Sequence, residues 1–177
     1  MHARLLAIAA AAASLAAAPA SAAETCHSRP GGQFGDARVC VSSVLPPQAG
    51  NSYGPDNLLK DDSGAWCEGA RGPGLGESVT IHQKPRMHFR TLGITNGYAK
   101  SDETFRRNGR IKRALIETER GFRKTVTLKD TREYQKVVIP TTRTAWIRLT
   151  IVEVYPGTSA SDTCLSGFAP NLEELNR

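Results

Sequence analysis

Residues 53–77 read YGPDNLLKDDSGAWCEGARGPGLGE, and this irregular stretch constrains the fold more than any other part of the chain. It shows neither a helical nor a strand period, and Gly, Pro, Asp and Asn dominate it. Trp66 and Cys67 nevertheless stand side by side within it. A long polar loop with such an anchor is typical of a loop with a defined shape. Two interpretations are open: a structural loop pinned by Trp66 and a disulfide, or one wall of a ligand site.

The first 22 residues have the pattern of a secretory signal peptide. His2 and Arg4 form a short basic start, an apolar run covers residues 5–18, and small residues 20–22 follow at the cleavage spacing. The run is shorter than the roughly 20 apolar residues that a membrane-spanning helix needs. We therefore predict a secreted or periplasmic protein that does not span the membrane.

The rest of the chain is expected to form one domain of about 150 residues, long enough for a hydrophobic core. We expect a mostly loop-like N-terminal extension over residues 23–37, the domain over residues 38–168 and a polar tail over residues 169–177. The formal net charge is +6, and removal of Arg4 with the signal peptide leaves 22 basic and 17 acidic residues, or +5. A moderately basic exported protein often meets anionic envelope surfaces.

Short segments with strand periodicity follow one another along the domain. The clearest is AWIRLTIVEVY at residues 145–155, in which Ile147, Leu149 and Ile151 share one face. No long amphipathic helix interrupts these segments, so the sequence predicts an all-β antiparallel sandwich or barrel of about eight strands. The expected strands are 38–45, 77–83, 87–96, 110–118, 122–129, 135–139, 145–155 and 164–168.

The segments between these strands carry weaker signals. Proline suits a helix start, so one helical turn is expected at residues 55–59. We expect a turn at residues 84–85, a bulge near Gly93 and a polar loop over residues 97–109.

Four cysteines remain after the signal peptide, and an even number in an exported chain favours disulfides over metal or redox use. Three pairings are possible. We favour Cys26–Cys40 as a local link that closes about 15 residues, which leaves Cys67–Cys164 to tie the loop to the C-terminal end. No C-x-x-C spacing is present, so zinc and thioredoxin-like chemistry are not indicated.

Four segments follow one another along the chain: YGPDNLL with AWCEG and GLGE (53–77), ITNGYAKSDETFRRNGRIK (94–112), TAWIRLTIVEVYPG (144–157) and SDTCLSG (161–167). In this order they resemble a bacterial discoidin-like domain, the galactose-binding jelly roll related to coagulation-factor C-type domains. The subgroup that the chain resembles is the NADase-type glycan-binding, or NAD-glycohydrolase translocation, domain. The resemblance spans roughly residues 38–168. It implies a galactose-binding-like jelly-roll sandwich with loops gathered at one end, and binding rather than catalysis.

Discoidin-like domains often hold a structural calcium ion in the loop that corresponds to residues 57–66, where Asn57, Asp61 and Asp62 are the candidate ligands. Lys60 stands where the family usually has Asp, and Gly167 stands where its last strand commonly has Glu. A hard cation wants about six to eight oxygen ligands. We therefore expect no cofactor and a disulfide in the clamping role, since the resemblance places Cys67 and Cys164 on these same two segments.

The loop end is the expected place for a carbohydrate site. Trp66 either plugs the sandwich end or offers an aromatic face to a sugar ring. Asn96 and Asn108 either belong to Asn-Gly turns or join Tyr98 and Arg110 in reading sugar hydroxyls. The candidate ligand-binding residues are Tyr53, Trp66, Glu68, Asn96, Tyr98, Lys100, Asn108, Arg110 and Lys112.

A cluster of basic residues over positions 106–124 supports an alternative function. It is either a solvated strand face or a surface for an anionic envelope component or another exported protein. Few aromatic residues are interleaved with it, so we expect no nucleic acid partner. The cluster consists of Arg106, Arg107, Arg110, Lys112, Arg113, Arg120, Arg123 and Lys124.

Catalysis has little support in the sequence. His27, His82 and His88 lie in no nucleophile–base pattern, and a G-x-S-x-G elbow is absent. We therefore predict a non-catalytic exported binding module that recognises carbohydrate at the loop end. The alternative is a protein-interaction or envelope-adhesion module that uses the basic hairpin face.

Overall fold

The computed structural model describes residues 23–32, 35–60 and 63–171. The predicted signal peptide, Asp61, Asp62 and most of the predicted polar tail therefore lie outside the described residues. Within the described ranges, no helix is long and apolar enough to cross a membrane.

The described residues form eight strands and two short helical segments. The helical segments are the 3₁₀ helix η1 (Pro55–Leu59), as predicted from its proline, and α1 (Asp102–Arg107). The strands are β1 (Thr25–Gly32), β2 (Gly35–Val41), β3 (Trp66–Cys67), β4 (Ser78–Asn96), β5 (Gly109–Thr118), β6 (Arg123–Thr127), β7 (Tyr134–Tyr155) and β8 (Thr163–Pro170).

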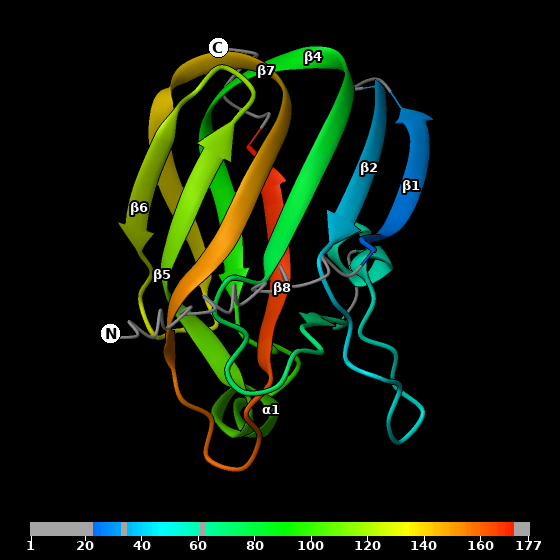
Figure 1. The fold of residues 1–177 in the computed structure, drawn as a ribbon, viewed down its shortest axis with the longest axis vertical. Helices are drawn as coiled ribbons and strands as arrows, with labels where there is room; N and C mark the ends of the chain where they lie inside the picture. The colour runs from blue at the N-terminus through cyan, green and yellow to red at the C-terminus, as the bar shows by residue number, and fades with distance from the viewer. Residues whose placement is uncertain (1–22, 33–34, 61–62, 172–177) are drawn as a thin grey trace, which may run out of the picture.

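Two long strands, β4 and β7, build both layers of the sandwich, and they arch together over its upper end (Figure 1). The first part of β4 pairs with β2 and with the second part of β7, which continues to β5 and β6. The second part of β4 pairs with the first part of β7 and with β8, which continues to β3. The pairing is antiparallel except for a short parallel contact between β5 and β8. The predicted jelly-roll sandwich is confirmed.

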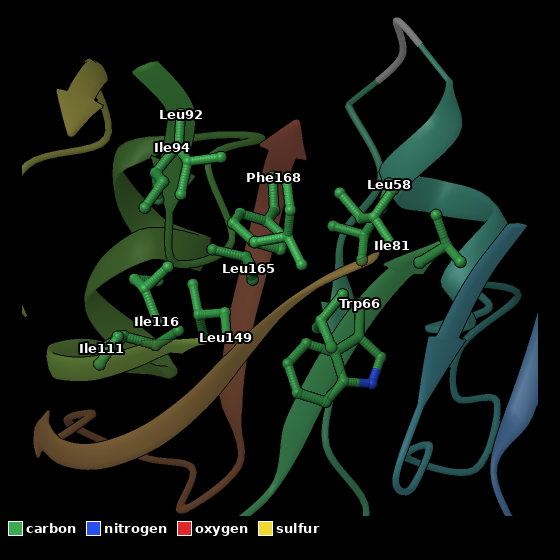
Figure 2. Packing of buried hydrophobic residues seen from close by; sticks show 14 of the residues in the cluster. Leu58, Trp66, Ile81, Leu92, Ile94, Ile111, Ile116, Leu149, Leu165 and Phe168 are labelled. Carbon is green, nitrogen blue, oxygen red and sulfur yellow. The ribbon is translucent and has the colours of Figure 1, made fainter. Parts of the chain in front are cut away.

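The core lies between the two layers, and strand alternation supplies it. Ile147, Leu149 and Ile151, which were predicted to share one face, are at most 1% exposed. Figure 2 shows Ile81 and Leu149 from one layer packed toward Ile94 and Phe168 from the other.

The N-terminal segment departs from the prediction. Residues 24–36 were expected to be loop, but β1 pairs with β2 from Thr25 to Gly32 as an edge strand. The expectation was wrong because β1 has no apolar alternation of its own, and its strand conformation comes from the neighbouring strand. Pro30 is tolerated there because an edge strand has one unpaired side.

The agreement in strand number hides compensating errors. β1 and β3 were not predicted, whereas two predicted pairs of strands are continuous as β4 and β7. The expected turn at residues 84–85 is wrong: β4 runs on, with register shifts between His82 and Met87 and between Phe89 and Thr91. Gly93 itself pairs regularly, but register shifts lie on both sides of it, between Phe89 and Thr91 and between Thr95 and Asn96, in agreement with the bulge expected near this residue.

The expected polar loop over residues 97–109 contains α1. Ser101 begins the helix with a capping box: its hydroxyl accepts the Thr104 N–H at 3.1 Å, and the Thr104 hydroxyl accepts the Ser101 N–H at 3.0 Å. The box holds Thr rather than the more usual Glu or Gln at its second position, which made the signal easy to miss.

Both favoured disulfides are confirmed. Cys26 and Cys40 are direct partners on β1 and β2, and Cys67 and Cys164 are direct partners on β3 and β8. They are consistent with an oxidising compartment.

Candidate binding site at the loop end

Loop segments gather at the lower end of the sandwich in Figure 1: residues 42–54 and 68–77, residues 97–108 with α1, and residues 156–162. We call this region the loop end. It is the end at which the sequence placed its candidate ligand-binding residues, and the structure brings most of them together there.

A small buried cluster holds these connections in place. The disulfide between Cys67 and Cys164 forms its centre, with Ala65 and Tyr98 buried beside it. Tyr53 packs edge-to-face on Tyr98, with ring centroids 6.2 Å apart. Both tyrosines were predicted to read a ligand, but Tyr98 is only 7% exposed and Tyr53 is half-buried, so they act mainly as packing residues.

Trp66 is a plug of the sandwich and not a stacking platform. Its side chain is 0% exposed and belongs to the main core (Figure 2). The indole Nε1 donates to the backbone carbonyl of Ser43 at 2.8 Å. The interpretation of this indole as a sugar-stacking surface is therefore wrong, because its faces are covered by the core.

Glu68 also has a structural role in place of the predicted ligand contact. Its buried carboxylate accepts the N–H of Thr163 at 2.9 Å and the N–H of Ala70 at 2.7 Å. It packs against Gly74, where a Cβ would overlap the carboxyl group. Burial raises the pKa of Glu68, against the opposing effect of the two N–H donors. The residue ties the loop after β3 to the start of β8.

This raised pKa predicts how stability depends on pH. A carboxyl whose pKa is higher in the folded than in the unfolded protein favours folding below its ordinary value of 4.5, and that contribution is lost as pH rises through the folded pKa. Replacing Glu68 by Gln should therefore reduce the fall in the free energy of unfolding above about pH 4.5. Urea denaturation at a series of pH values measures the free energy of unfolding. The variant Glu103→Gln serves as the control, because it removes a carboxyl group at an exposed position. Parallel curves for wild type and Glu68→Gln would contradict this role.

Asn96 and Arg110, also predicted to read sugars, tie strands and loops together. The Asn96 side chain donates to the Ile111 carbonyl at 2.8 Å and accepts the Ile111 N–H at 2.9 Å. Arg110 makes two hydrogen bonds to Asp130, at 3.0 and 2.8 Å, and donates to the Pro156 carbonyl at 2.7 Å. Both are buried, at 0% and 9% exposure. Direct contact with a ligand is therefore not their role in this structure.

The remaining predicted residues lie closer to solvent. Asn108 ends α1, and its side-chain amide donates to the Thr104 carbonyl at 2.8 Å. Lys112 forms an ion pair with Glu153. Lys100 is exposed. Of these residues, Lys100 is the one whose position suits direct contact with a ligand.

A hollow of about 360 Å³ opens at the loop end. It is lined by Pro73, Gly109, Val154 and residues 156–161, which we call the rim. Three of the rim residues carry hydroxyl groups, namely Thr158, Ser159 and Ser161. None of these residues was predicted from the sequence. The only available signal was the run of small polar residues after the clearest strand.

Several residues that were predicted as ligands instead position this hollow. Arg110 holds the Pro156 carbonyl, and Glu68 holds Thr163, whose hydroxyl donates to the Pro73 carbonyl at 2.9 Å. Gly157 lies so close to the Arg107 carbonyl that a Cβ there would overlap it. The hollow is thus built on a rigid frame, which favours binding because little ordering is needed.

The basic cluster is neutralised in part. Arg107 pairs with Glu103, Arg123 with Glu117, and both Lys112 and Arg113 with Glu153. Such exposed pairs contribute little stability, but they reduce the positive potential of the hairpin face. Binding of an anionic partner to this face stays a prediction. The ion pairs leave the face with less free positive charge than the sequence indicated.

The described part of the predicted calcium loop does not fit a cation. The Asn57 amide nitrogen donates to the carbonyls of Ser52 and Ala65, at 2.7 and 2.9 Å, so these oxygens converge on a nitrogen. Lys60 forms an ion pair with Asp56 at 2.7 Å. A hard cation needs oxygen ligands without a competing ammonium group. We derive no calcium-dependent step for this protein.

Comparisons with known proteins agree with this architecture. The model of the NAD glycohydrolase translocation F5/8 type C domain family matches residues 33–169. Among curated proteins, none matches the sequence significantly.

Solved structures share the fold at low sequence identity. The family 32 carbohydrate-binding module of Clostridium perfringens NanJ, in complex with galactose, has a TM-score of 0.55 at 13% identity, over 75% of this chain and 90% of that one. The module CpGH89CBM32-5 of the same organism, in complex with GalNAc-β-1,3-galactose, has a TM-score of 0.56 at 11% identity, over 75% and 92%. Arabinofuranosyltransferase AftD from Mycobacteria has a TM-score of 0.59 at 16% identity; the match covers 82% of this chain but only 11% of AftD.

Proposed function

The chain belongs to the NAD glycohydrolase translocation F5/8 type C domain family, and from this we propose that it is a non-catalytic, exported carbohydrate-binding module. The observation that carries the proposal is the loop-end hollow. Its volume of about 360 Å³ lies within the usual range for small-ligand pockets. Main-chain groups and hydroxyls line it, and both kinds of group pair well with sugar hydroxyls.

The similar structures support this proposal. Two of the matched modules are complexes with galactose or with a galactose-containing disaccharide, and a third, from AlyQ, is a complex with 4,5-unsaturated mannuronic acid. We infer a neutral sugar for the loop-end hollow, because its lining residues carry no charged side chain.

Filling the hollow should abolish sugar binding. Ser161 is exposed on the rim, so Ser161→Trp is expected to weaken binding at least about tenfold by occupying the space of the ligand. A glycan array identifies the sugar, and isothermal titration calorimetry with galactose and with the best array ligand measures the loss. Thr125→Trp, on the exposed side of β6, is the matched control because it adds the same side chain away from the loop end.

Two outcomes would refute the proposal. One is a wild-type protein that binds no glycan across neutral and acidic arrays. The other is a Ser161→Trp variant with unchanged affinity and an unchanged melting temperature. Exported location is tested separately, by fractionating cells that express the full chain.

A further inference from the structure

A second hollow, of about 500 Å³, lies on β1, β2 and β4, toward the end of the sandwich opposite the loop end (Figure 1). Strand residues line it, in contrast to the loops around the first hollow. The polar side chains that matter for its chemistry are Ser28, Asp36, Arg38, His82 and Lys84.

Three residues that line the hollow form one row across the strands, and Trp146 continues this row on a fourth strand. Ser28 of β1 pairs with Arg38 of β2, Arg38 pairs with His82 of β4, and His82 pairs with Trp146 of β7. Direct cross-strand partners point to the same face of a sheet and lie close together. The half-buried indole of Trp146 therefore flanks the hollow on the outer face of the layer.

The hollow carries excess positive charge. Arg29, Arg38 and Lys84 supply three cations and Asp36 one carboxylate, a sum of +2 with a neutral His82. Among the residues that the structure describes, neither Arg38 nor Lys84 forms an ion pair, and the one hydrogen bond recorded for the Arg38 guanidinium goes to the Cys26 sulfur at 3.1 Å. Sulfur is a weak acceptor. The guanidinium thus keeps most of its donors for another partner.

Elsewhere in the outer layer, arginines do meet carboxylates. Other described cations, such as Arg90 and Arg106, also form no ion pair, so what distinguishes the hollow is that three cations line it together. The paired side chains are Arg86 with Glu119, Arg113 with Glu153, Arg123 with Glu117 and Arg148 with Glu24.

One further group on the outer row points to a ligand with negative charge. Burial and then the positive charge of Arg38 lower the pKa of His82, with Arg148 acting in the same direction and Glu24 against it. A bound anion would reverse much of this effect.

We propose that this hollow binds a sugar acid, whose carboxylate is held by Arg38 and Lys84 and whose hydroxyls meet Ser28, which lies on the same face of the layer as both cations. The row that ends at Trp146 gives one side of the site an aromatic edge against the apolar face of the sugar ring. The volume of about 500 Å³ accommodates one or two sugar units. This site is distinct from the neutral-sugar site at the loop end.

Calorimetric titration with glucuronate tests the proposal, with glucose and acetate as comparison ligands. Glucuronate should bind at least about tenfold more tightly than either, because only it supplies both carboxylate and hydroxyls. The double variant Arg38→Gln/Lys84→Gln should weaken glucuronate binding at least about tenfold. Arg120→Gln/Lys124→Gln removes the same charge from exposed positions of the neighbouring hairpin and should leave the affinity unchanged.

Tryptophan fluorescence supplies a second readout that places the ligand. The chain has two tryptophans, and Trp66 is fully buried in the core. Glucuronate should therefore change the emission of Trp146, and Trp146→Phe should remove that signal. Lowering the pH from about 7.5 to about 5 should tighten binding as His82 gains its proton, and His82→Gln should remove this dependence.

The proposal is overturned if wild-type protein does not bind glucuronate, if acetate binds as tightly, or if both double variants lose affinity equally. Ser161→Trp must leave glucuronate binding intact. If it abolishes that binding instead, the anion occupies the loop-end hollow and the second site is refuted.

Discussion

Replacing Trp66 by alanine is expected to lower the free energy of unfolding by about 4 kcal/mol. The indole is 0% exposed and packs in the main core, so its removal leaves a large cavity between the layers. The change also removes the donor to the Ser43 carbonyl. Urea denaturation followed by circular dichroism measures this loss of stability. Circular dichroism is preferred to fluorescence because the variant keeps only one of the two tryptophans.

Two further variants separate the effect of lost volume from that of the lost hydrogen-bond donor, and the role of Trp66 from that of Trp146. Trp66→Phe keeps much of the volume but not the Nε1 donor, and we expect a loss of about 1–3 kcal/mol from the unpaired carbonyl and the smaller ring. Trp146→Ala is the matched control and should cost less, because that indole is only half-buried. If Trp66→Phe were fully stable but could no longer bind sugar, the plug interpretation would be wrong.

Removing the disulfide between Cys67 and Cys164 is expected to have the largest effect of any double substitution. The two residues are 97 positions apart, so in the chain-entropy model the link is worth about 4.7 kcal/mol. Cys26 and Cys40 are 14 positions apart, and the same model assigns their link about 3 kcal/mol. The pairs should be replaced by alanine one at a time and compared by urea denaturation.

The two pairs should also differ in their effect on function. Cys67 and Cys164 form the centre of the buried cluster that holds the loop end, so their replacement should weaken sugar binding as well as stability. The Cys26–Cys40 link joins β1 to β2 and should leave sugar binding at the loop end unchanged. A larger loss of stability from the Cys26–Cys40 variant would contradict the expected order.

Local alternation accounts for the parts of the fold that could be predicted. In residues 145–155 the alternate positions Ile147, Leu149 and Ile151 are large and apolar, so any sheet that buries one face here must bury these three. β1 lacks this alternation, and its conformation depends on hydrogen bonds to β2. The continuity of β4 and β7 was unpredictable for a related reason. Breaks in polarity at their bends look like turns until partner strands extend across them.

The candidate site shows a second limit of prediction from sequence, which concerns the roles of polar and aromatic residues. Tyr53, Trp66, Asn96 and Arg110 were predicted to contact a ligand, but each is buried or half-buried and makes contacts within the protein. Aromatic, amide and guanidinium groups suit sugar recognition, and the same groups suit the buried ends of loops, whose main-chain polar atoms need partners. Residue type alone does not distinguish these uses.

The sequence by itself determined the all-β class, the family resemblance and the expectation of two disulfides, because apolar periodicity, motif order and cysteine number are properties of the chain, whereas the pairing of the cysteines was settled by the structure. Only the tertiary structure decided which polar groups are satisfied. Arg110 meets Asp130 across 20 positions, and Glu68 meets Thr163 across 95. Arg38 and Lys84 meet no carboxylate among the described residues. Whether a charged side chain holds the fold or remains available to a ligand depends on such distant partners, and only the tertiary fold brings them together.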